Sequence, residues 1–430
     1  MSKKRILKRT VSILSAIAMI GGVLSLPTAQ SKESCGGQVR QEGKWTTVLA
    51  PEYPDAKIHP TTVAASDPAN ARRLFMSDGK SLMRTEDGGC KWTEVWTVPS
   101  ADSDEQYRGF IQRPLLRIQA IAIPRAAPQR VYVGVGTSNY FTPTFCLQCT
   151  DLSVPEFHVL RSDKGGDKDS WVLAEGGLPP FSATQNNNQP IINDLEISPS
   201  NAARVYLIAG SVLYSTSDSG NTWAEVNPVT DPAATAERVA QGRGLCAGCK
   251  MTVDPDRPSD LWIYTGSFVY RSSDGGKTLI PVPFGSTGTG SVGAHEVRIH
   301  RAGGGPATVV VASYGACPVV AISCLFISKE GGKSGWFAVR PPRRFSYADA
   351  GQVYQQVMTI DFLSGHSLIA TTVRGQPWVL NLKTEKWRYV GASHFQSYFE
   401  RPPRQVTVAN DSKSTSAWTT YSYEIYHGRG

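Results

Sequence analysis

The sequence predicts an all-β protein, folded as a single seven-bladed β-propeller. Three observations predict this fold class: a short turn motif recurs, several copies lie 55 or 56 residues apart, and short apolar strands precede each copy. Four short antiparallel strands at this period are typical of a propeller blade. Such repeats also explain how 430 residues form one domain, since a single compact core rarely exceeds about 250–300 residues.

The recurring motif is a hydroxyl residue, an acidic residue two positions later, a glycine two positions further on, and then an aromatic residue. We name each copy a box turn. Complete copies occupy residues 85–92 and 216–223, the copy at 272–279 lacks only the tryptophan, and weaker copies lie at 161–166 and 328–332. Hydroxyl and carboxylate side chains hydrogen bond to tight turns, and glycine supplies positive φ. The residues predicted to hold these turns are Asp87, Asp163, Asp218, Asp274, Glu330, Trp92 and Trp223.

The spacing of the acidic residues is regular. Asp163, Asp218, Asp274 and Glu330 are separated by 55, 56 and 56 residues, and a further step of 56 reaches Lys386 in a decayed copy. The step from Asp87 to Asp163 is 76 residues, so this unit carries an insertion. The regularity predicts one repeat architecture without a second globular domain.

The two ends of the chain predict the seventh blade. Residues 43–48 resemble the strand that follows the first box turn, and three further strands are predicted at 405–408, 417–420 and 423–426. Pairing the N-terminal strand with these three would close the ring and remove its free edges. The propeller would then span 43–430, after an N-terminal lead at 31–42. A six-bladed ring with a separate tail is the alternative.

Residues 1–30 have the pattern of a secretory signal peptide. Basic residues between Lys3 and Arg9 precede an uncharged run from Val11 to Leu26. A short stretch with small residues follows, as at the end of a signal peptide. The run is short for a membrane span, which needs roughly 20 apolar residues. We therefore expect a secreted, periplasmic or cell-surface protein without stable membrane insertion after cleavage; an uncleaved anchor is the alternative.

The net charge argues against a nucleic-acid partner. The chain carries +8, and five of these charges lie in residues 1–30, which contain no acidic residue, so that the remainder carries about +3. A charge this mild does not indicate binding to nucleic acid or to an acidic membrane surface.

The box turns resemble the Asp-box, or bacterial-neuraminidase, repeats of the sialidase-like propeller superfamily, over roughly residues 43–426. The resemblance implies a fold and no single function, because that superfamily includes sialidases, xyloglucan-cleaving enzymes, sorting receptors and photosystem assembly factors. Sialidases carry a Phe/Tyr-Arg-Ile-Pro motif on the first inner strand. Here the strand near 61–66 has no arginine, and Arg117-Ile118-Gln119 lacks the proline. No catalytic residue of the sialidases can therefore be assigned to this sequence by matching motifs.

Polar residues stand at the starts of the predicted inner strands, which line the mouth of a propeller channel. They are Gln119, Asn193, Asp194, Lys250, His295 and Glu296. Asp194 and Glu296, with His295 adjacent, are the candidates for paired carboxylates of the kind used in glycoside hydrolysis. The alternative is that they are solvated or hydrogen-bonded residues at strand ends. The sequence has no Ser/His/Asp signature, P-loop or dinucleotide fingerprint, and we expect no cofactor and no metal.

Eight cysteines in an exported chain favour disulfides. They fall into the local pairs Cys146/Cys149, Cys246/Cys249 and Cys317/Cys324, leaving Cys35 and Cys90. Two Cys-x-x-Cys pairs can also build a zinc site, and free thiols are a third possibility. Haem attachment is excluded, because Thr150 and Lys250 stand where histidine is needed.

The long loops predict a binding face opposite the box turns. The longest occupy 98–116, 138–156, 178–190, 341–356 and 393–404, and they are rich in Tyr, Phe, Arg, Asn and Gln. Loops on a rigid scaffold commonly carry function. The predicted binding residues are Arg113, Gln119, Lys250, Arg343 and Arg404. We expect an exported, non-catalytic binding or assembly protein that takes a protein or glycan on this face. The alternative is a carbohydrate-active hydrolase, a sialidase-like glycosidase.

Overall fold

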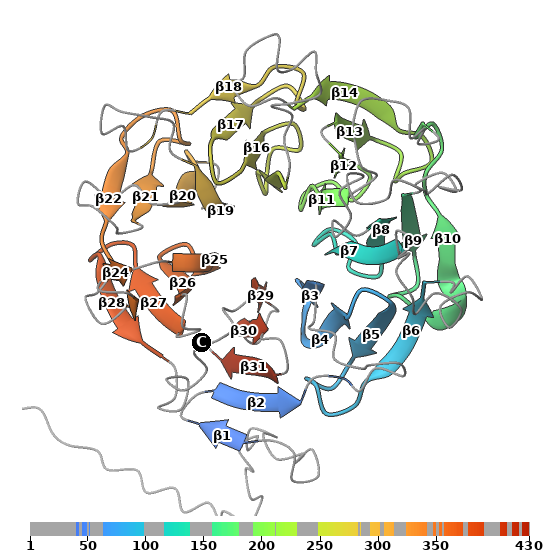
Figure 1. Cartoon of the computed structure of the whole chain (residues 1–430), viewed down its shortest axis with the longest axis horizontal. Coiled ribbons are helices and arrows are strands. Elements are labelled where there is room, and N and C mark those ends of the chain that lie inside the picture. The colour runs from blue at the N-terminus through green and yellow to red at the C-terminus, as the bar shows by residue number, and fades with distance from the viewer. Residues whose placement is uncertain are drawn as a thin grey trace, which may run out of the picture.

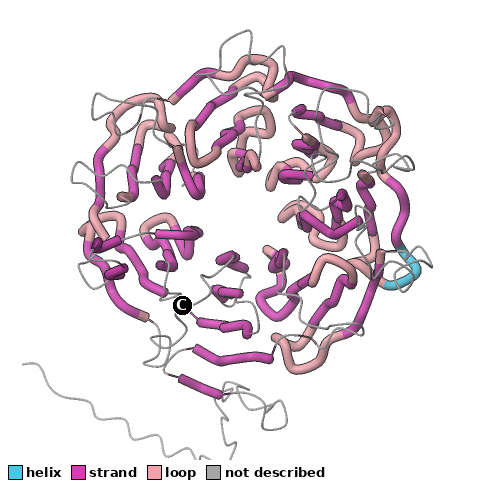
Figure 2. The backbone as a smooth tube through the Cα atoms, viewed as in Figure 1, coloured by secondary structure: helices cyan, strands magenta, loops and turns pink. Residues whose placement is uncertain are grey.

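The computed structural model describes most of the repeat region. The described residues are 40–42, 45–49, 51, 63–98, 116–137, 157–179, 192–210, 212–229, 248–282, 284, 293–301, 305–313, 324–341, 347–349, 352–354, 357–372, 377–390, 405–410, 415–420 and 424–429. The predicted signal at 1–30 lies outside them. Strands make up almost all regular structure in this part, and its helical content is one 3₁₀ turn, η2 (Lys168–Ser170), on the rim (Figure 2). Among these residues, no helix has the length and apolarity to cross a bilayer.

Six four-stranded antiparallel sheets follow one another along the chain and stand around a ring (Figure 1). The first sheet contains β3 (Val63–Asp67), β4 (Asn70–Ser77), β5 (Ser81–Thr85) and β6 (Thr93–Thr97). The second contains β7 (Leu116–Ala122), β8 (Val131–Thr137), β9 (His158–Ser162) and β10 (Trp171–Leu173). The third contains β11 (Ile192–Ile197), β12 (Val205–Ala209), β13 (Val212–Thr216) and β14 (Ala224–Pro228). The fourth sheet contains β15 (Lys250–Val253), β16 (Leu261–Tyr264), β17 (Val269–Ser272) and β18 (Ile280–Pro281). The fifth contains β19 (Ala294–His300), β20 (Thr308–Ser313), β21 (Leu325–Ser328) and β22 (Phe337–Val339). The sixth contains β25 (Val357–Ser364), β26 (Ser367–Thr372), β27 (Pro377–Asn381) and β28 (Lys386–Tyr389). The first strand of each sheet is the inner one.

A five-stranded sheet joins the two ends of the chain. Its order is β1 (Arg40–Glu42), β2 (Trp45–Leu49), β31 (Glu424–Arg429), β30 (Thr415–Thr420) and β29 (Gln405–Asn410). Strand β2 pairs antiparallel with β31, and β29 lies against β3 on one side and β25 on the other. Within the described residues, four-stranded sheets made of consecutive strands therefore number six, as in the six-bladed alternative. The expected count of seven depends on this mixed sheet.

One predicted loop contains structure of its own. A hairpin of β23 (Tyr347–Asp349) and β24 (Gln352–Tyr354) lies within the segment 341–356. The pattern of apolar residues there is too short to separate a hairpin from a loop.

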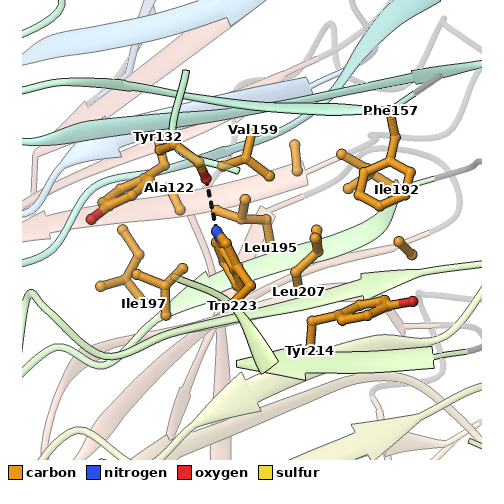
Figure 3. Packing of buried hydrophobic residues seen from close by; sticks show 14 residues of the cluster. Ala122, Tyr132, Phe157, Val159, Ile192, Leu195, Ile197, Leu207, Tyr214 and Trp223 are labelled. Carbon is orange, nitrogen blue, oxygen red and sulfur yellow. Dashed lines mark hydrogen bonds between the residues drawn. The ribbon is translucent and has the colours of Figure 1, made fainter. Parts of the chain in front are cut away.

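The apolar core lies between neighbouring sheets. Between the second and third sheets, side chains of both pack into one cluster that includes Tyr132, Leu195, Leu207 and Trp223 (Figure 3). Similar clusters fill the spaces between the first and second, third and fourth, fourth and fifth, and fifth and sixth sheets. The second to fifth sheets thus each bury one face against the sheet before and the other against the sheet after.

Tryptophans that follow the box turns also bond neighbouring sheets to each other. The Trp171 indole N–H donates to the carbonyl of Val95 at 3.0 Å, and Trp387 donates to the carbonyl of Arg340 at 3.0 Å. Trp223 donates to the carbonyl of Ala174 at 2.7 Å, the dashed line in Figure 3. In all three cases the acceptor belongs to the preceding sheet, so these aromatic side chains hold adjacent sheets in register as well as burying apolar area.

The box turns have the predicted hydrogen bonds. In the third sheet, the Thr216 hydroxyl donates to Asp218 Oδ1 at 2.7 Å and accepts from the backbone N–H of Gly220 at 3.0 Å. Asp218 Oδ1 also accepts from the N–H of Thr222 at 2.9 Å. The turns after Thr85 and Ser272 repeat this pattern. After Ser328, the hydroxyl accepts from Gly332, and Glu330 accepts from the hydroxyl of Ser334.

The second box turn differs from the prediction. The hydroxyl that accepts from Gly166 belongs to Ser162, at 3.0 Å, so that Lys164 stands at the position of the aspartate in the other turns. Asp163 instead pairs with Arg130 at 2.5 Å and with Arg161 at 3.0 Å. The assignment of Asp163 as a turn-forming aspartate was therefore wrong, because the sequence allows two registers of the motif one residue apart.

The decayed sixth copy keeps the turn with a different side chain. Asn381 Oδ1 accepts from the N–H groups of Lys383 and Thr384, each at 3.0 Å. Lys386 lies after the turn, as the first residue of β28.

Candidate functional site

Four inner strands share one irregularity. The pairing of β7, β11, β19 and β25 with the next strand shifts by one residue, at Gln119, Asn193, His295 and Met358 respectively. Such bulges bend a strand and change the direction of its side chains, and they are common next to functional sites. Three of the polar residues singled out from the sequence are therefore the bulged residues themselves. Asp194 and Glu296 immediately follow the bulges in β11 and β19.

Side chains of the inner strands accept hydrogen bonds from the backbone of a neighbouring sheet. Gln119 Oε1 accepts from the N–H of Ile192 at 2.7 Å, and Asp194 Oδ2 from that of Met251 at 2.8 Å. Glu296 Oε2 accepts from the N–H of Ile360 at 2.6 Å, and Asp361 Oδ2 from that of Val408 at 2.9 Å. The last of these bonds reaches β29 in the mixed sheet. These side chains satisfy backbone donors that strand pairing leaves open.

The remaining oxygens of the two predicted catalytic carboxylates are also occupied. Asp194 Oδ1 accepts from the N–H of Leu195 at 3.1 Å and lies 3.9 Å from Lys250 Nζ. Glu296 Oε1 forms an ion pair with Arg298, whose Nε lies 3.8 Å from Asp361 Oδ1. Both carboxylates therefore take part in structural contacts through each of their oxygens.

Glu196, on β11 two residues after Asp194, is different. It is half-buried, and within the described residues its carboxylate makes no hydrogen bond and no ion pair. Burial, followed by repulsion from Asp194, raises the pKa of Glu196 to about 8, against the opposing attraction of Arg298 and Lys250. Burial also raises the pKa of Glu296 to about 7 and that of Asp361 above its usual range.

A buried tyrosine meets the same charges. Tyr264, at the end of β16, stands opposite Lys250 in the strand ladder, and its side chain is 3% exposed. Burial raises the pKa of its phenol, and the charges acting on that phenol belong to Arg298, Glu296, Asp194 and Glu196. We call Asp194, Glu196, Lys250, Tyr264, Glu296, Arg298 and Asp361 the channel cluster.

The structure brings some of the predicted residues together and leaves others undescribed. Asp194, Lys250 and Glu296 belong to the channel cluster. His295 lies beside it, with its pKa lowered by burial. Arg113, Arg343 and Arg404 lie outside the described residues, as does most of the predicted loop face. Within the described residues, no group of three or more His, Cys, Asp or Glu side chains is arranged to hold a metal ion.

Three cysteines fall within the described residues. Cys90, Cys249 and Cys324 are each disulfide-bonded, and no described cysteine is free. Cys35, Cys146, Cys149, Cys246 and Cys317 lie outside the described residues, so the pairing scheme stays a prediction.

Four members of the channel cluster were not predicted from the sequence. Glu196, Arg298 and Asp361 lie further along the inner strands, and Tyr264 lies on a second strand. Glu196 and Arg298 each follow a chosen carboxylate by two residues. Because side chains two apart in a strand share a face, this periodicity was the signal that could have found both.

Comparison with known proteins finds similarity in structure only. No family model and no curated protein matches the chain. The solved structures of YCF48 bound to D1 peptide and of YCF48 from Cyanidioschyzon merolae each have 12% identity and a TM-score of 0.52. Each match covers 90% of this chain and 98% of the other. The chain is a β-propeller. At this identity the likeness shows the fold and no activity.

A propeller of an ancestral GH74 enzyme is also similar, with 14% identity and a TM-score of 0.50. The match covers 90% of this chain and 51% of that enzyme, so this propeller corresponds to about half of the enzyme's length.

Proposed function

We propose that this chain is an exported, non-catalytic binding or assembly protein, which takes a protein or glycan on the face that carries its long loops. One observation carries the non-catalytic part. Both oxygens of Asp194 and of Glu296 contact backbone N–H groups or basic side chains of the inner strands. A general acid or base must present its carboxyl to substrate, and these two are used to hold neighbouring blades.

The neighbouring structures support a binding function. One solved YCF48 propeller holds a D1 peptide. That propeller and this chain match over nearly their whole lengths, so a peptide is a reasonable partner for the present fold, with a glycan as the other class. The Asp-box resemblance, the basic and apolar start at 1–30 and the disulfide-bonded cysteines agree with an exported protein.

The binding face can be tested with paired variants. Charge reversal at Arg113, Arg343 and Arg404 should weaken capture of an acidic partner from the cell envelope. The control is Asp218→Ala in a box turn, which should lower the unfolding temperature and leave the affinity of folded protein unchanged. Capture that survives the three reversals but is lost in folded Asp218→Ala protein would refute the assignment.

We also propose that the mixed sheet is the seventh blade of a closed ring. The pairing of β2 with β31, the position of β29 between β25 and β3, and the Asp361–Val408 bond support this reading. A Cys35–Cys90 disulfide would fix the N-terminal strand at this seam, and such links typically contribute about 2–4 kcal/mol. Peptide mapping without reduction should yield a linked Cys35–Cys90 peptide. Cys35 found free, or joined to another chain, would favour six blades with a separate tail.

One observation favours the alternative, a glycosidase. Glu196 has a pKa of about 8, in the range that suits a general acid at neutral pH. Turnover of fluorogenic sialosides or glucans that disappears in Glu196→Gln, Asp194→Asn or Glu296→Gln would replace the binding proposal with this one.

A further inference from the structure

We propose that β2 is a displaceable strand. It leaves the edge of β31 while the six four-stranded sheets stay folded, and the freed edge then takes an added peptide strand of the same sequence. The proposal rests on the mixed sheet being the seventh blade, and it goes beyond the partner binding proposed for the loop face. In Figure 1, β2 lies outside β31 on the rim of the ring.

The first observation is a hydrogen bond that is missing at this seam. In three sheets, the tryptophan after the box turn donates to the preceding sheet, as described for Trp171, Trp223 and Trp387. Trp92 is the corresponding residue of the first sheet, whose preceding neighbour in the ring is the mixed sheet. Its indole Nε1 is buried, and no residue in the described part of the chain accepts a hydrogen bond from it.

The second observation concerns the carbonyls that accept these bonds. Val95 lies where the pairing of β5 with β6 shifts by one residue. Ala174 and Arg340 lie one residue beyond the ends of β10 and β22. All three acceptors are therefore outside a regular ladder, so their carbonyls are free to point at the next sheet.

Strand β2 provides no carbonyl of this kind. It pairs with β31 from Trp45 to Leu49 without any shift in register. Val48 follows Trp45 by three residues, which is the position of Val95 in β6, and it lies within this ladder. A carbonyl in a regular ladder points along the sheet rather than toward the neighbouring sheet. The regular register of β2 therefore explains why the indole N–H of Trp92 has no acceptor.

The two observations together make β2 easier to release than β6 or β10. A buried N–H without an acceptor is unfavourable, and release of β2 would open the Trp92 N–H to water. Release of β6 or β10 would instead break the bond from Trp171 or from Trp223. Because residues 50–62 separate β2 from β3, β2 can leave without displacing the first sheet. Local opening of this kind costs less free energy than global unfolding.

The freed edge of β31 fits an extended peptide. It would present the backbone N–H and C=O groups that now pair with residues 45–49. In strand addition, main-chain hydrogen bonds to a sheet edge supply the affinity, and alternate side chains fix the register. The segment that already matches this edge is β2 itself. The occupant is therefore a peptide of residues 43–50, with the sequence Gly-Lys-Trp-Thr-Thr-Val-Leu-Ala.

Hydrogen exchange of the full chain measures release directly. It is carried out without reductant, because Cys90 beside Trp92 is disulfide-bonded. The amides of β2 should exchange about ten-fold faster than those of β6, a strand of equal length whose bond from Trp171 is in place. Equal protection of β2 and β6 would overturn the proposal and leave the closed ring standing. Equally fast exchange of β2 and of β29, β30 and β31 would refute the seventh blade, and release of a single strand with it.

Two aromatic variants test the missing bond. Trp223→Phe removes the bond to Ala174 and should speed exchange of β10 about ten-fold. Trp92→Phe is the matched variant, because it also loses an indole after a box turn, and it should speed exchange of β2 far less. An equal acceleration of β2 in Trp92→Phe would show that the indole N–H already holds this strand, and would overturn the proposal.

A fluorescein-labelled peptide of residues 43–50 tests the strand-binding edge. Fluorescence polarisation should show saturable binding to the full chain, and none of a scrambled peptide of the same composition. Thr47→Pro in the chain weakens β2, because proline cannot donate to a ladder and Thr47 is paired on both sides. With its internal competitor weakened, the edge should bind the peptide about five-fold more tightly or better.

Glu225→Pro, on the outer strand β14, is the matched control for this variant and should leave peptide affinity unchanged. Unfolding temperatures establish that both variants are folded. Three outcomes would overturn the proposal: no peptide binding to folded Thr47→Pro, an equal gain in Glu225→Pro, or equal binding of the scrambled peptide.

Discussion

Acidic residues of the box turns and of the inner strands experience opposite environments. The pKa of Asp218 is lowered to about 2, chiefly by the hydrogen bond from Thr216, and that of Asp274 is lowered to about 2, chiefly by the backbone N–H of Thr278. Burial instead raises the pKa of Glu196 to about 8 and that of Glu296 to about 7. The fold therefore stabilises the charged form of the box-turn aspartates and the protonated form of the two inner-strand glutamates.

The difference separates two uses of a carboxylate. In a box turn, the donors lie within four residues of the carboxylate, so the local chain stabilises the charge and solvent remains close. On the inner strands, Asp194 and Glu296 each accept one hydrogen bond from the backbone of the next sheet, and the ring brings like charges together. The box turns are therefore local structural devices. The channel cluster is assembled from the third to the sixth sheets, and carboxyl groups with perturbed pKa values of this kind are common at functional sites.

The largest expected effect tests the packing of the box turns. Gly331 and Gly332 are adjacent, with φ of 68° and 72°, but a Cβ on Gly332 would lie 2.2 Å from Trp262 whereas one on Gly331 meets nothing within 4 Å. Both alanine variants should lose about 1–3 kcal/mol through backbone strain. Gly332→Ala should lose a further 1–3 kcal/mol or so through overpacking. Chemical denaturation measures the difference, and equal losses would show that the contact with Trp262 relaxes freely.

The next effect tests the local hydrogen bonds. Thr216→Val keeps the shape of a buried side chain and leaves the N–H of Gly220 without its acceptor. We expect a loss of about 1–3 kcal/mol in unfolding free energy. Thr222→Val is the control, because the exposed Thr222 hydroxyl also donates to Asp218; it should change stability by less than about 0.5 kcal/mol. Equal effects would mean that the buried hydroxyl has no special part in the turn.

The third prediction uses pH to separate the two regions. The folded-state pKa values of Asp218 and Asp274 lie below the ordinary 3.8, so their contribution to stability is lost as pH falls from about 4 to about 2. Glu196 and Glu296 have raised values, so folded protein binds their protons more tightly than unfolded chain does, and stability falls as pH rises from about 4.5 to about 8. Unfolding temperatures across this range should show both losses of stability, one at acid pH and one near neutral pH.

Two variants assign these losses to residues. Asp218→Asn should reduce the loss of stability at acid pH, and Glu196→Gln should reduce the loss near neutral pH. If the loss of stability near neutral pH persists unchanged in Glu196→Gln and in Glu296→Gln, neither carboxyl is held above its ordinary pKa.

The sequence was most informative where structure is local. The turns after Thr85, Thr216 and Ser272 have the predicted bonds, because every partner lies within a few residues. The same local prediction failed at Ser162 and Asp163, where two registers match the motif. The bond from Gly166 to Ser162 and the ion pair of Asp163 with Arg130 decide between them.

The channel cluster was predictable only in part. Asp194 and Glu296 stand at strand starts and were found, but their bonds to Met251 and Ile360 join residues of different blades. Tyr264 could not be found from periodicity, since its relation to Glu196 depends on how neighbouring sheets pack. Long-range packing of this kind has no signature in a window of sequence.

The pairing of β2 with β31 has a consequence for synthesis of the chain. Translation proceeds from the N-terminus at about 5–20 residues per second. Trp171 and Trp223 bond backward, to sheets made earlier, so each new blade finds its neighbour already present. Strand β2 is the exception. Its partner β31 follows all six four-stranded sheets in the chain, so the edge of β2 that pairs with β31 stays open while those sheets are made. During that interval this open edge can pair with a strand of another chain.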